Sequence, residues 1–360
     1  MMKRLRQRSA SCHPSHFRRL QNLWASSIGL GTYLGDADDA TDARYAEAIR
    51  AALAQGCNVL DTAVNYRCQR SERTIGRTLE ALCTEGTLTR DEVILCTKGG
   101  YLPFDGAVPD DPGRCLVETV ITPGLASYEE IVAGCHCLAP AYLDHMLRLS
   151  LANLRVAALD VYYLHNPEQQ LDEIGPEPFL QRLEAAFALL EARAQEGAFR
   201  YYGVATWNGL RGRPGGRGQL SLEALVRLAE RLGGDDHHFR VIQLPYNLAM
   251  PEAFTFANQV VGGEPMTVLQ AAARLGLSVV TSAGLLQSRL TRLPASFESH
   301  IPGLATAPQR ALQFARSTPG VTTALAGMSR RAHVEENLSL TRQPLLDEES
   351  IRRLFDRTKW

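Results

Sequence analysis

The chain has 360 residues, of which 45% are hydrophobic and 21% charged, and its formal net charge is −1. This length allows one large barrel or two ordinary domains, and the near-neutral charge argues against nucleic acid or a membrane surface as the partner. The apolar runs are too short to span a bilayer. Eight cysteines without a Cys-x-x-Cys pair favour reduced thiols, so we expect a cytoplasmic protein.

Residues 1–27 form a basic segment, with no acidic residue before Asp36. The segment lacks the apolar core of a secretory signal peptide. Two interpretations stay open, a transit peptide and a disordered or loosely attached arm, and we favour the arm. Its basic residues are Lys3, Arg4, Arg6, Arg8, Arg18 and Arg19.

From residue 28 onward, short apolar runs alternate with longer amphipathic ones. The runs predict eight strands, at Ile28–Thr32, Asn58–Asp61, Val93–Thr97, Val161–His165, Tyr201–Thr206, Val241–Leu244, Leu277–Thr281 and Thr323–Ala326. Helical spacing of apolar residues predicts helices at Tyr45–Gln55, Tyr142–Leu154, Phe179–Ala194, Leu222–Leu232, Thr267–Leu275 and Gln309–Arg316. Four of these helices are followed by a glycine suited to a C-terminal cap, at Gly56, Gly197, Gly233 and Gly276.

This alternation predicts an α/β fold, a single-domain (β/α)8 TIM barrel over residues 28–345, with a C-terminal helix and tail at 346–360. A doubly wound sheet is the alternative, but it would gather functional residues at one switch point rather than along successive strands. Residues 99–141, rich in Pro, Gly and Asp, predict a long loop insertion after the third strand, over the active-site mouth. A basic, glycine-rich loop at 209–218 follows the fifth strand on the same face.

Ionisable residues close three of the predicted strands. Asp61, Lys98 and His165 each end an apolar run, and Tyr66 follows five residues after Asp61. Such residues at the carboxyl ends of barrel strands are typical of an active site. A tyrosine has an ordinary pKa of about 10, and a neighbouring lysine lowers it. Asp61 would hold the lysine and His165 would polarise a carbonyl, so the set predicts proton delivery to a carbonyl oxygen.

Each of these residues has a simpler interpretation when taken alone. Asp61 could cap the next turn, Tyr66 could be a packed or surface aromatic, and Lys98 could be solvated at a strand end. His165 alone is more often a partly buried histidine with its hydrogen bonds satisfied. Their joint placement on one predicted face favours the active site.

The ordered motifs around these four residues resemble those of the aldo-keto reductase family over residues 28 to 340. The resemblance rests on Gly29-Leu30-Gly31-Thr32, Asp61-Thr62-Ala63-Val64-Asn65-Tyr66, Ser71-Glu72, Ile75-Gly76, Thr97-Lys98 and Leu164-His165-Asn166-Pro167. It implies a (β/α)8 barrel that binds NADPH without a Rossmann fold and uses an Asp-Tyr-Lys-His tetrad. It therefore implies Tyr66 as the general acid, assisted by Lys98, Asp61 and His165.

The resemblance also implies where the cofactor binds. Gln243 falls in a segment that contacts the nicotinamide amide, and residues 281–286 resemble the strand and loop beneath the nicotinamide and pyrophosphate. Residues 326–330 and 336–337 resemble the adenosine 2′-phosphate and adenine site, and a helix start with an arginine suits a phosphate. Arg330 and Arg331 could instead be ordinary solvated helix charges. The implied cofactor residues are Gly31, Thr32, Thr206, Asn208, Gln243, Ser282, Leu285, Gly327, Ser329, Arg330, Glu336 and Asn337.

The sequence departs from the family pattern after the fifth strand. The family usually has Gly-x-Ser-Asn there, whereas this chain has Gly203-Val204-Ala205-Thr206-Trp207-Asn208, so Thr206 or Asn208 would have to replace the carboxamide contact. Two other motifs carry no function. The glycines at 29, 31 and 35 lack the Rossmann spacing, and Cys135-His136-Cys137 is too tight for a structural zinc site, so we expect no metal.

Three functions remain at this stage. The leading hypothesis is an NADPH-dependent reductase of an aldehyde or ketone, or the reverse reaction, acting on a small-molecule carbonyl substrate. The second is an NADPH-binding regulatory or sensor protein with little turnover. The third is a lyase that uses Lys98 as a Schiff-base amine. The sequence leaves the substrate, the reaction direction, the oligomeric state and any protein partner open.

Overall fold

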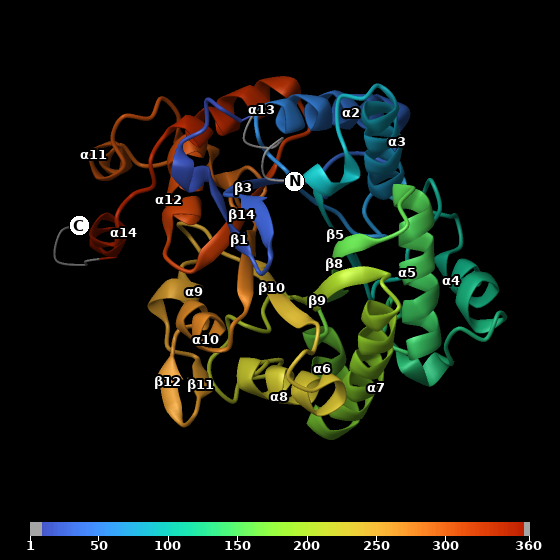
Figure 1. The fold of residues 1–360 in the computed structure, drawn as a ribbon. Coiled ribbons are helices and arrows are strands. Elements are labelled where there is room, and N and C mark those ends of the chain that lie inside the picture. The colour runs from blue at the N-terminus through green and yellow to red at the C-terminus, as the bar shows by residue number, and fades with distance from the viewer. Residues whose placement is uncertain (1–8, 356–360) are drawn as a thin grey trace.

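The computed structural model describes residues 9–355 of the chain. Its centre is a closed barrel in the order β3, β4, β5, β8, β9, β10, β13, β14 (Figure 1), and the eight strands pair in parallel throughout. The predicted (β/α)8 barrel is therefore confirmed. The strands are β3 (Ile28–Gly31), β4 (Val59–Asp61), β5 (Ile94–Gly99), β8 (Leu159–His165), β9 (Phe199–Ala205), β10 (Phe239–Pro245), β13 (Ser278–Ser282) and β14 (Val321–Gly327).

Helices surround the strands (Figure 1). The longer ones are α2 (Asp39–Ala54), α3 (Arg70–Thr84), α5 (Pro140–Leu154), α7 (Pro176–Gln195), α8 (Leu222–Gly233), α10 (Val268–Arg274), α12 (Ala307–Ser317) and α13 (Arg331–Leu338). Shorter ones are α4 (Pro112–Leu116), α6 (Glu168–Ile174), α9 (Glu252–Thr255), α11 (Ser296–His300) and α14 (Glu348–Arg353), and a small hairpin is formed by β11 (Gln259–Val261) and β12 (Glu264–Met266). Within residues 9–355, every helix is too short or too polar to cross a bilayer.

The strands read as continuous apolar runs because both of their faces are buried. One face points into the barrel, where Val59, Val161 and Val280 belong to a single inner cluster. The other face belongs to the larger cluster that also contains the buried side chains of the surrounding helices, among them Leu60 and Tyr162. The helix–strand alternation in the sequence follows from this two-layer packing.

Side-chain caps fix where helices start, and the spacing of apolar residues does not reveal these caps. Asp38 accepts a hydrogen bond from the Thr41 N–H at 2.7 Å, so α2 begins at Asp39 rather than at the predicted Tyr45. Gly56, Gly197 and Gly276 do follow helices with positive φ. Gly233, in contrast, is the last residue of α8, and Gly234 is the residue that follows the helix with a positive φ, +69°.

The basic N-terminal segment is not a loose arm over the part that the structure describes, and this corrects the prediction; residues 1–8 lie outside it. A 3₁₀ turn (Pro14–His16) leads into an antiparallel hairpin of β1 (Phe17–Leu20) and β2 (Leu23–Ser26). Leu20 and Leu23 join the inner cluster of the barrel. Arg18 donates to the backbone carbonyls of Val321 and Arg316, so its charge anchors the hairpin at the start of β14.

The insertion at 99–141 is also more ordered than the predicted loop. It contains α4, a π-helical turn (Val117–Ile121), a 3₁₀ turn (Tyr128–Glu130) and the short hairpin β6 (Ile131–Val132) and β7 (His136–Cys137). Figure 1 places α4 at the periphery of the molecule. Short elements with little apolar periodicity are not visible in a sequence of Pro, Gly and Asp, because their order comes from local caps such as the Asp111 side chain on the Arg114 N–H.

Candidate active site

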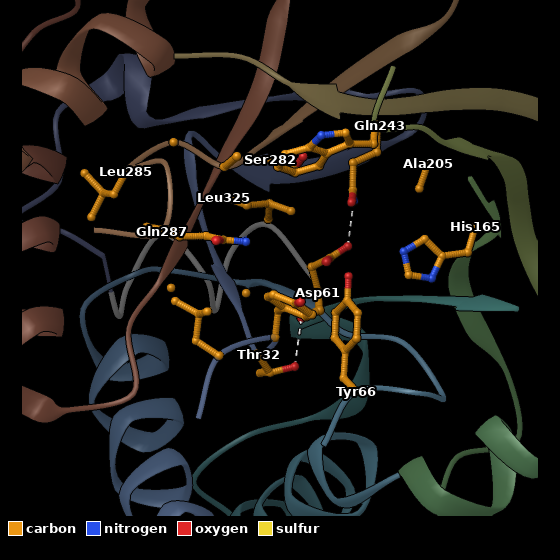
Figure 2. Close-up of a pocket in the computed structure, with 18 of the residues that line it drawn as sticks. Thr32, Asp61, Tyr66, His165, Ala205, Gln243, Ser282, Leu285, Gln287 and Leu325 are labelled. Carbon is orange, nitrogen blue, oxygen red and sulfur yellow. Dashed lines mark hydrogen bonds between the residues drawn. The ribbon is translucent and has the colours of Figure 1, made fainter. Parts of the chain in front are cut away.

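The four predicted catalytic residues come together at the carboxyl ends of the barrel strands. Asp61 ends β4, Lys98 is the penultimate residue of β5, and His165 ends β8. Figure 2 shows the Tyr66 hydroxyl directed towards the Asp61 carboxylate, with the His165 imidazole beside it. The ring centres of Tyr66 and His165 are 5.7 Å apart, and Lys98 Nζ lies 4.8 Å from the Tyr66 ring centre.

Lys98 and Asp61 form a buried ion pair. Lys98 Nζ donates to Asp61 Oδ1 at 2.6 Å and to the Thr62 carbonyl at 2.7 Å. The other carboxylate oxygen accepts from Gln243 Nε2 at 2.7 Å. Because both oxygens of Asp61 accept hydrogen bonds, the carboxylate holds Lys98 in one position. Gln243 was predicted to contact the nicotinamide, and here its amide braces Asp61.

The loop that carries Tyr66 is strained and pinned. Arg67, Cys68 and Gln69 all have positive φ, between 50° and 68°, which non-glycine residues rarely adopt. The Arg67 guanidinium fixes this turn by donating to the Asp36 carbonyl at 2.8 Å and to Asp42 Oδ1 at 2.5 Å. The turn therefore holds Tyr66 in a defined position in the loop after β4.

Burial dominates the electrostatics of the tetrad. It raises the pKa of Tyr66, and the positive charge of Lys98 acts against that rise. We expected Lys98 to bring the pKa below the ordinary value, so the net direction is a correction. Burial lowers the pKa of Lys98, but Asp61 and Tyr66 more than offset it, and the ammonium persists. Burial also lowers the pKa of His165 well below its usual range, so its imidazole is neutral at neutral pH.

Two further buried histidines make the stability of the fold pH-dependent. Burial lowers the pKa of His16 and of His136 from 6.5 to about 4. Between these values the unfolded chain binds protons that the folded chain does not, so stability is full above pH 6.5 and falls as the pH drops towards 4. We expect each histidine to contribute about 1.4 kcal/mol per pH unit to the free energy of unfolding in this window.

Urea unfolding at pH 7, 6 and 5 measures this loss. His136→Gln should make the stability less dependent on pH, and His145→Gln, at an exposed position on α5, is the matched control. Equal stability at pH 7 and 5 in the unaltered protein would contradict the prediction.

A cavity of about 460 Å³ opens beside the tetrad. Asp61, Tyr66 and His165 line one side, and Ser282, Leu285 and Gln287 line the other (Figure 2). This volume lies within the usual range for small-molecule sites. Seven of the predicted cofactor residues line the cavity, namely Gly31, Thr32, Thr206, Gln243, Ser282, Leu285 and Gly327.

The remaining predicted cofactor residues do not line this cavity. Asn208 offers its backbone N–H to Glu168, and Ser329 and Arg330 precede α13. Glu336 and Asn337 stand on α13, where Asn337 is buried. Their assignment to the carboxamide and the adenosine end stays a prediction.

The loop after β9 is held by a buried carboxylate. Glu168 Oε1 accepts from three consecutive backbone N–H groups, those of Trp207 at 2.7 Å, Asn208 at 3.0 Å and Gly209 at 3.2 Å. This anchor leaves Thr206 at the cavity wall, and its buried hydroxyl has no hydrogen-bond partner within residues 9–355. A buried hydroxyl without a partner at a cavity wall is a ready contact for a ligand.

The insertion reaches the site at two residues. Tyr101 lines the cavity, and His136 contacts the carbonyl of His165. The flanking Cys135 and Cys137 do not join it in a metal site, since no three His, Cys, Asp or Glu side chains gather closely enough to hold a metal within the part of the chain that the structure describes.

A family model described as the aldo/keto reductase family matches residues 27–211, just over half of the chain. The chain belongs to this family. The matched part of this aldo/keto reductase carries all four tetrad residues. A search of curated proteins finds no match.

Solved structures agree with the fold of this aldo/keto reductase. An aldo/keto reductase from Klebsiella pneumoniae, solved with NADP and acetate, is 22% identical with a TM-score of 0.63 and covers 96% of this chain and 95% of its own. A glycerol dehydrogenase from Gluconobacter oxydans is 19% identical with a TM-score of 0.65 and the same two coverages, 96% and 95%. An aldo-keto reductase from Bacillus halodurans, in its holo form, is 20% identical with a TM-score of 0.61 and covers 94% of this chain and 95% of its own.

Several cavity residues of this aldo/keto reductase were not predicted. Some had a signal in the sequence, because Asn65 precedes Tyr66 and Tyr101 follows Lys98 by three residues. Ala205 and Leu325 stand on the strands β9 and β14, and most of the others come from loops whose path the sequence does not reveal. The lining residues outside the predicted residues and the predicted cofactor segments are Tyr33, Leu34, Asn65, Tyr101, Asn166, Ala205, Trp207, Gln287, Ser288 and Leu325.

Proposed function

We propose that this chain is an NADPH-dependent reductase of uncharged aldehydes or ketones, with Tyr66 as the general acid. The observation that carries the proposal is that Tyr66, Asp61 and the neutral His165 line one cavity, with Lys98 buried beside them in an ion pair with Asp61. A phenol, an ammonium and an imidazole around one point suit protonation of a carbonyl oxygen.

The four residues have separate roles in this proposal. The pKa of Tyr66 is raised, so its hydroxyl keeps a proton to donate. Lys98 stabilises the phenolate that forms when the proton leaves, and Asp61 keeps the ammonium in place. A neutral His165 orients the carbonyl by donating a hydrogen bond from its single N–H group.

The residues of the cavity fit a nicotinamide dinucleotide. Gln243 and Thr206 present an amide and a partnerless hydroxyl, which suit a carboxamide. The backbone N–H groups of Gly284 and Leu285, in the loop after β13, donate to no acceptor in residues 9–355, which suits an anionic pyrophosphate. When bound, NADPH supplies the hydride. The Klebsiella pneumoniae relative was solved with NADP, which supports this cofactor class.

Thr206→Val tests the replaced carboxamide contact. The substitution removes the hydroxyl and keeps the shape, so we expect NADPH affinity to fall about threefold to tenfold while the melting temperature stays constant. Fluorescence titration of both proteins with NADPH measures the ratio. Equal affinities would remove Thr206 from the cofactor site.

The cavity mouth favours an uncharged substrate with an apolar body. Tyr33, Leu34 and Trp207 line it and are 55%, 38% and 40% exposed, so they present apolar surface to a ligand there. No lysine or arginine lines the cavity in residues 9–355, and its one carboxylate, Asp61, is already paired. A carboxylate or phosphate on the substrate would therefore lose its hydration without gaining a positively charged partner.

The test is a titration with NADPH and NADH, followed by NADPH oxidation with matched carbonyl compounds. We expect benzaldehyde to exceed 4-carboxybenzaldehyde in kcat/KM by at least about tenfold. Equal values would overturn the substrate class, and tight NADPH binding without turnover of any carbonyl would favour the sensor hypothesis. The Schiff-base hypothesis is disfavoured because Lys98 is buried, charged and engaged by Asp61 and Thr62.

A further inference from the structure

We propose that His136, supplied by the insertion at 99–141, is a positioning residue that fixes His165 through the main chain. The proposal rests on the proposed function only for its kinetic consequence. The structural part of the proposal, that the His136 imidazole holds the main chain of His165, does not depend on that function.

His165 needs such support because its ring is not fixed by its own nitrogen atoms. His165 is half-buried, and its buried Nδ1 atom has no hydrogen-bond partner within residues 9–355. A catalytic side chain is usually oriented by a hydrogen bond on the atom that does not react. Here the orientation of the ring must come from its backbone and from packing.

The insertion contacts His165 at its backbone. The ladder between β5 and β8 ends at the pair of Gly99 and Leu164, and Tyr101 then bridges to His136 instead. His136 Nε2 lies 2.7 Å from the His165 carbonyl oxygen. The imidazole thus supplies the donor that β5 no longer provides at the end of β8.

The hydrogen-bond partners define the tautomer of His136. A carbonyl oxygen only accepts, so Nε2 must carry the proton. Nδ1 then accepts from Gln170 Nε2 at 3.2 Å, and the same amide nitrogen donates to the His136 carbonyl at 3.0 Å. Arg182 Nη1 donates to Gln170 Oε1 at 2.6 Å, which fixes the amide orientation. In this chain of donors from Arg182 through Gln170 and His136 to the His165 carbonyl, every donor faces an acceptor.

Packing adds to this chain. The Tyr101 ring lies edge-on to both imidazoles, with its centre 5.0 Å from that of His136 and 4.9 Å from that of His165. Its hydroxyl donates to Gln169 at 2.6 Å and accepts from Asn166 at 3.1 Å. At Gly100, with φ +141°, a Cβ atom would lie 2.9 Å from His136 Nε2 and 3.0 Å from the His165 carbonyl, so a larger residue would separate them.

The first test is the state of the two rings, and it does not depend on turnover. In protein labelled with ¹⁵N-histidine, we expect His136 to show the Nε2–H tautomer. We expect the His165 ring signals to move in His136→Leu and to remain near their original positions in His136→Gln, whose amide can still donate. An Nδ1–H tautomer for His136, or His165 signals that ignore His136→Leu, would overturn the proposal even if the protein reduced no carbonyl.

The second test separates positioning from general damage. We expect His136→Leu to lower kcat roughly tenfold to a hundredfold, with NADPH affinity within about twofold, and His136→Gln to restore most of it. If His136 acts through His165, His136→Leu should cost almost nothing further in a His165→Ala background. If the double variant loses kcat by the product of the two single-variant losses, the proposal is overturned. If His136→Leu does not fold, Gln170→Leu replaces it, and an unchanged tautomer and kcat would then contradict the chain of donors.

Discussion

Tyr66→Phe should lower kcat by about 10²- to 10⁴-fold while leaving the affinity for NADPH within about twofold. The substitution removes one hydroxyl and keeps the ring, so the packing against His165 and Tyr33 survives. The proton donor is lost, but the side chains on the opposite wall of the cavity are untouched. Steady-state NADPH oxidation with benzaldehyde, together with a fluorescence titration, measures both quantities.

Tyr33→Phe is the matched control for this prediction. Tyr33 lies against Tyr66 with ring centres 5.0 Å apart, lines the same cavity and is largely exposed. Loss of its hydroxyl should change kcat by less than about threefold, because no step is assigned to it. A Tyr66→Phe protein that keeps full turnover would remove Tyr66 from the proton-delivery role.

Lys98→Met should destabilise the protein by about 3–5 kcal/mol and abolish turnover. The substitution leaves the Asp61 carboxylate buried and without its cation, with only the Gln243 amide as a donor. Removing one partner of a buried ion pair costs more than the pair contributes, because the remaining charge stays desolvated. Tyr66 also loses the charge that stabilises its phenolate. Chemical denaturation and steady-state kinetics measure the two effects.

Two controls sharpen the Lys98 prediction. In Lys98→Met/Asp61→Asn the unpaired charge is gone, so stability should recover in part while turnover should not. Arg50→Met breaks an exposed ion pair with Glu85, in which the side chains are 41% and 49% exposed, and should cost no more than about 1 kcal/mol. An equal loss of stability for Lys98→Met and Arg50→Met would contradict the view that burial sets the cost.

The barrel and the tetrad could be predicted because both follow from short local patterns in the sequence. Each buried strand is a continuous apolar run, and an aspartate, a lysine or a histidine at its end has few other reasons to be there. The alternating order of strand and helix along the chain also limits the topology. The helix α3, although absent from the predicted set, had a signal of the same kind, with Ile75, Leu79 and Leu82 on its buried face.

The rest depends on contacts between distant segments. Arg18 is expected from the sequence to be a solvated charge, but in the fold it anchors a hairpin to the start of β14, 303 residues away. His136 stands in a Cys-His-Cys triplet that suggested only an unfavourable zinc site, whereas its partners are a backbone carbonyl and a glutamine. The mouth residues Tyr33 and Trp207 come to line one cavity only after the barrel closes.

The pKa of Tyr66 shows a different limit. The sequence indicates that a lysine is near the phenol, and this proximity alone favours a lowered pKa. It does not indicate how deeply the group is buried, and burial proves to be the larger effect. The role of Lys98 is therefore to stabilise the phenolate relative to an equally buried phenol without a cation.

The measurement that tests the account most directly is the stoichiometry of a reaction between the purified protein, NADPH and benzaldehyde. Quantifying both products by chromatography should give one benzyl alcohol for each NADPH consumed, with the rate of consumption lowered at least about 100-fold in Tyr66→Phe. Saturable NADPH binding with no alcohol formed from benzaldehyde or any other uncharged carbonyl would contradict a reductase, and NADPH consumed without alcohol would contradict carbonyl reduction as the reaction.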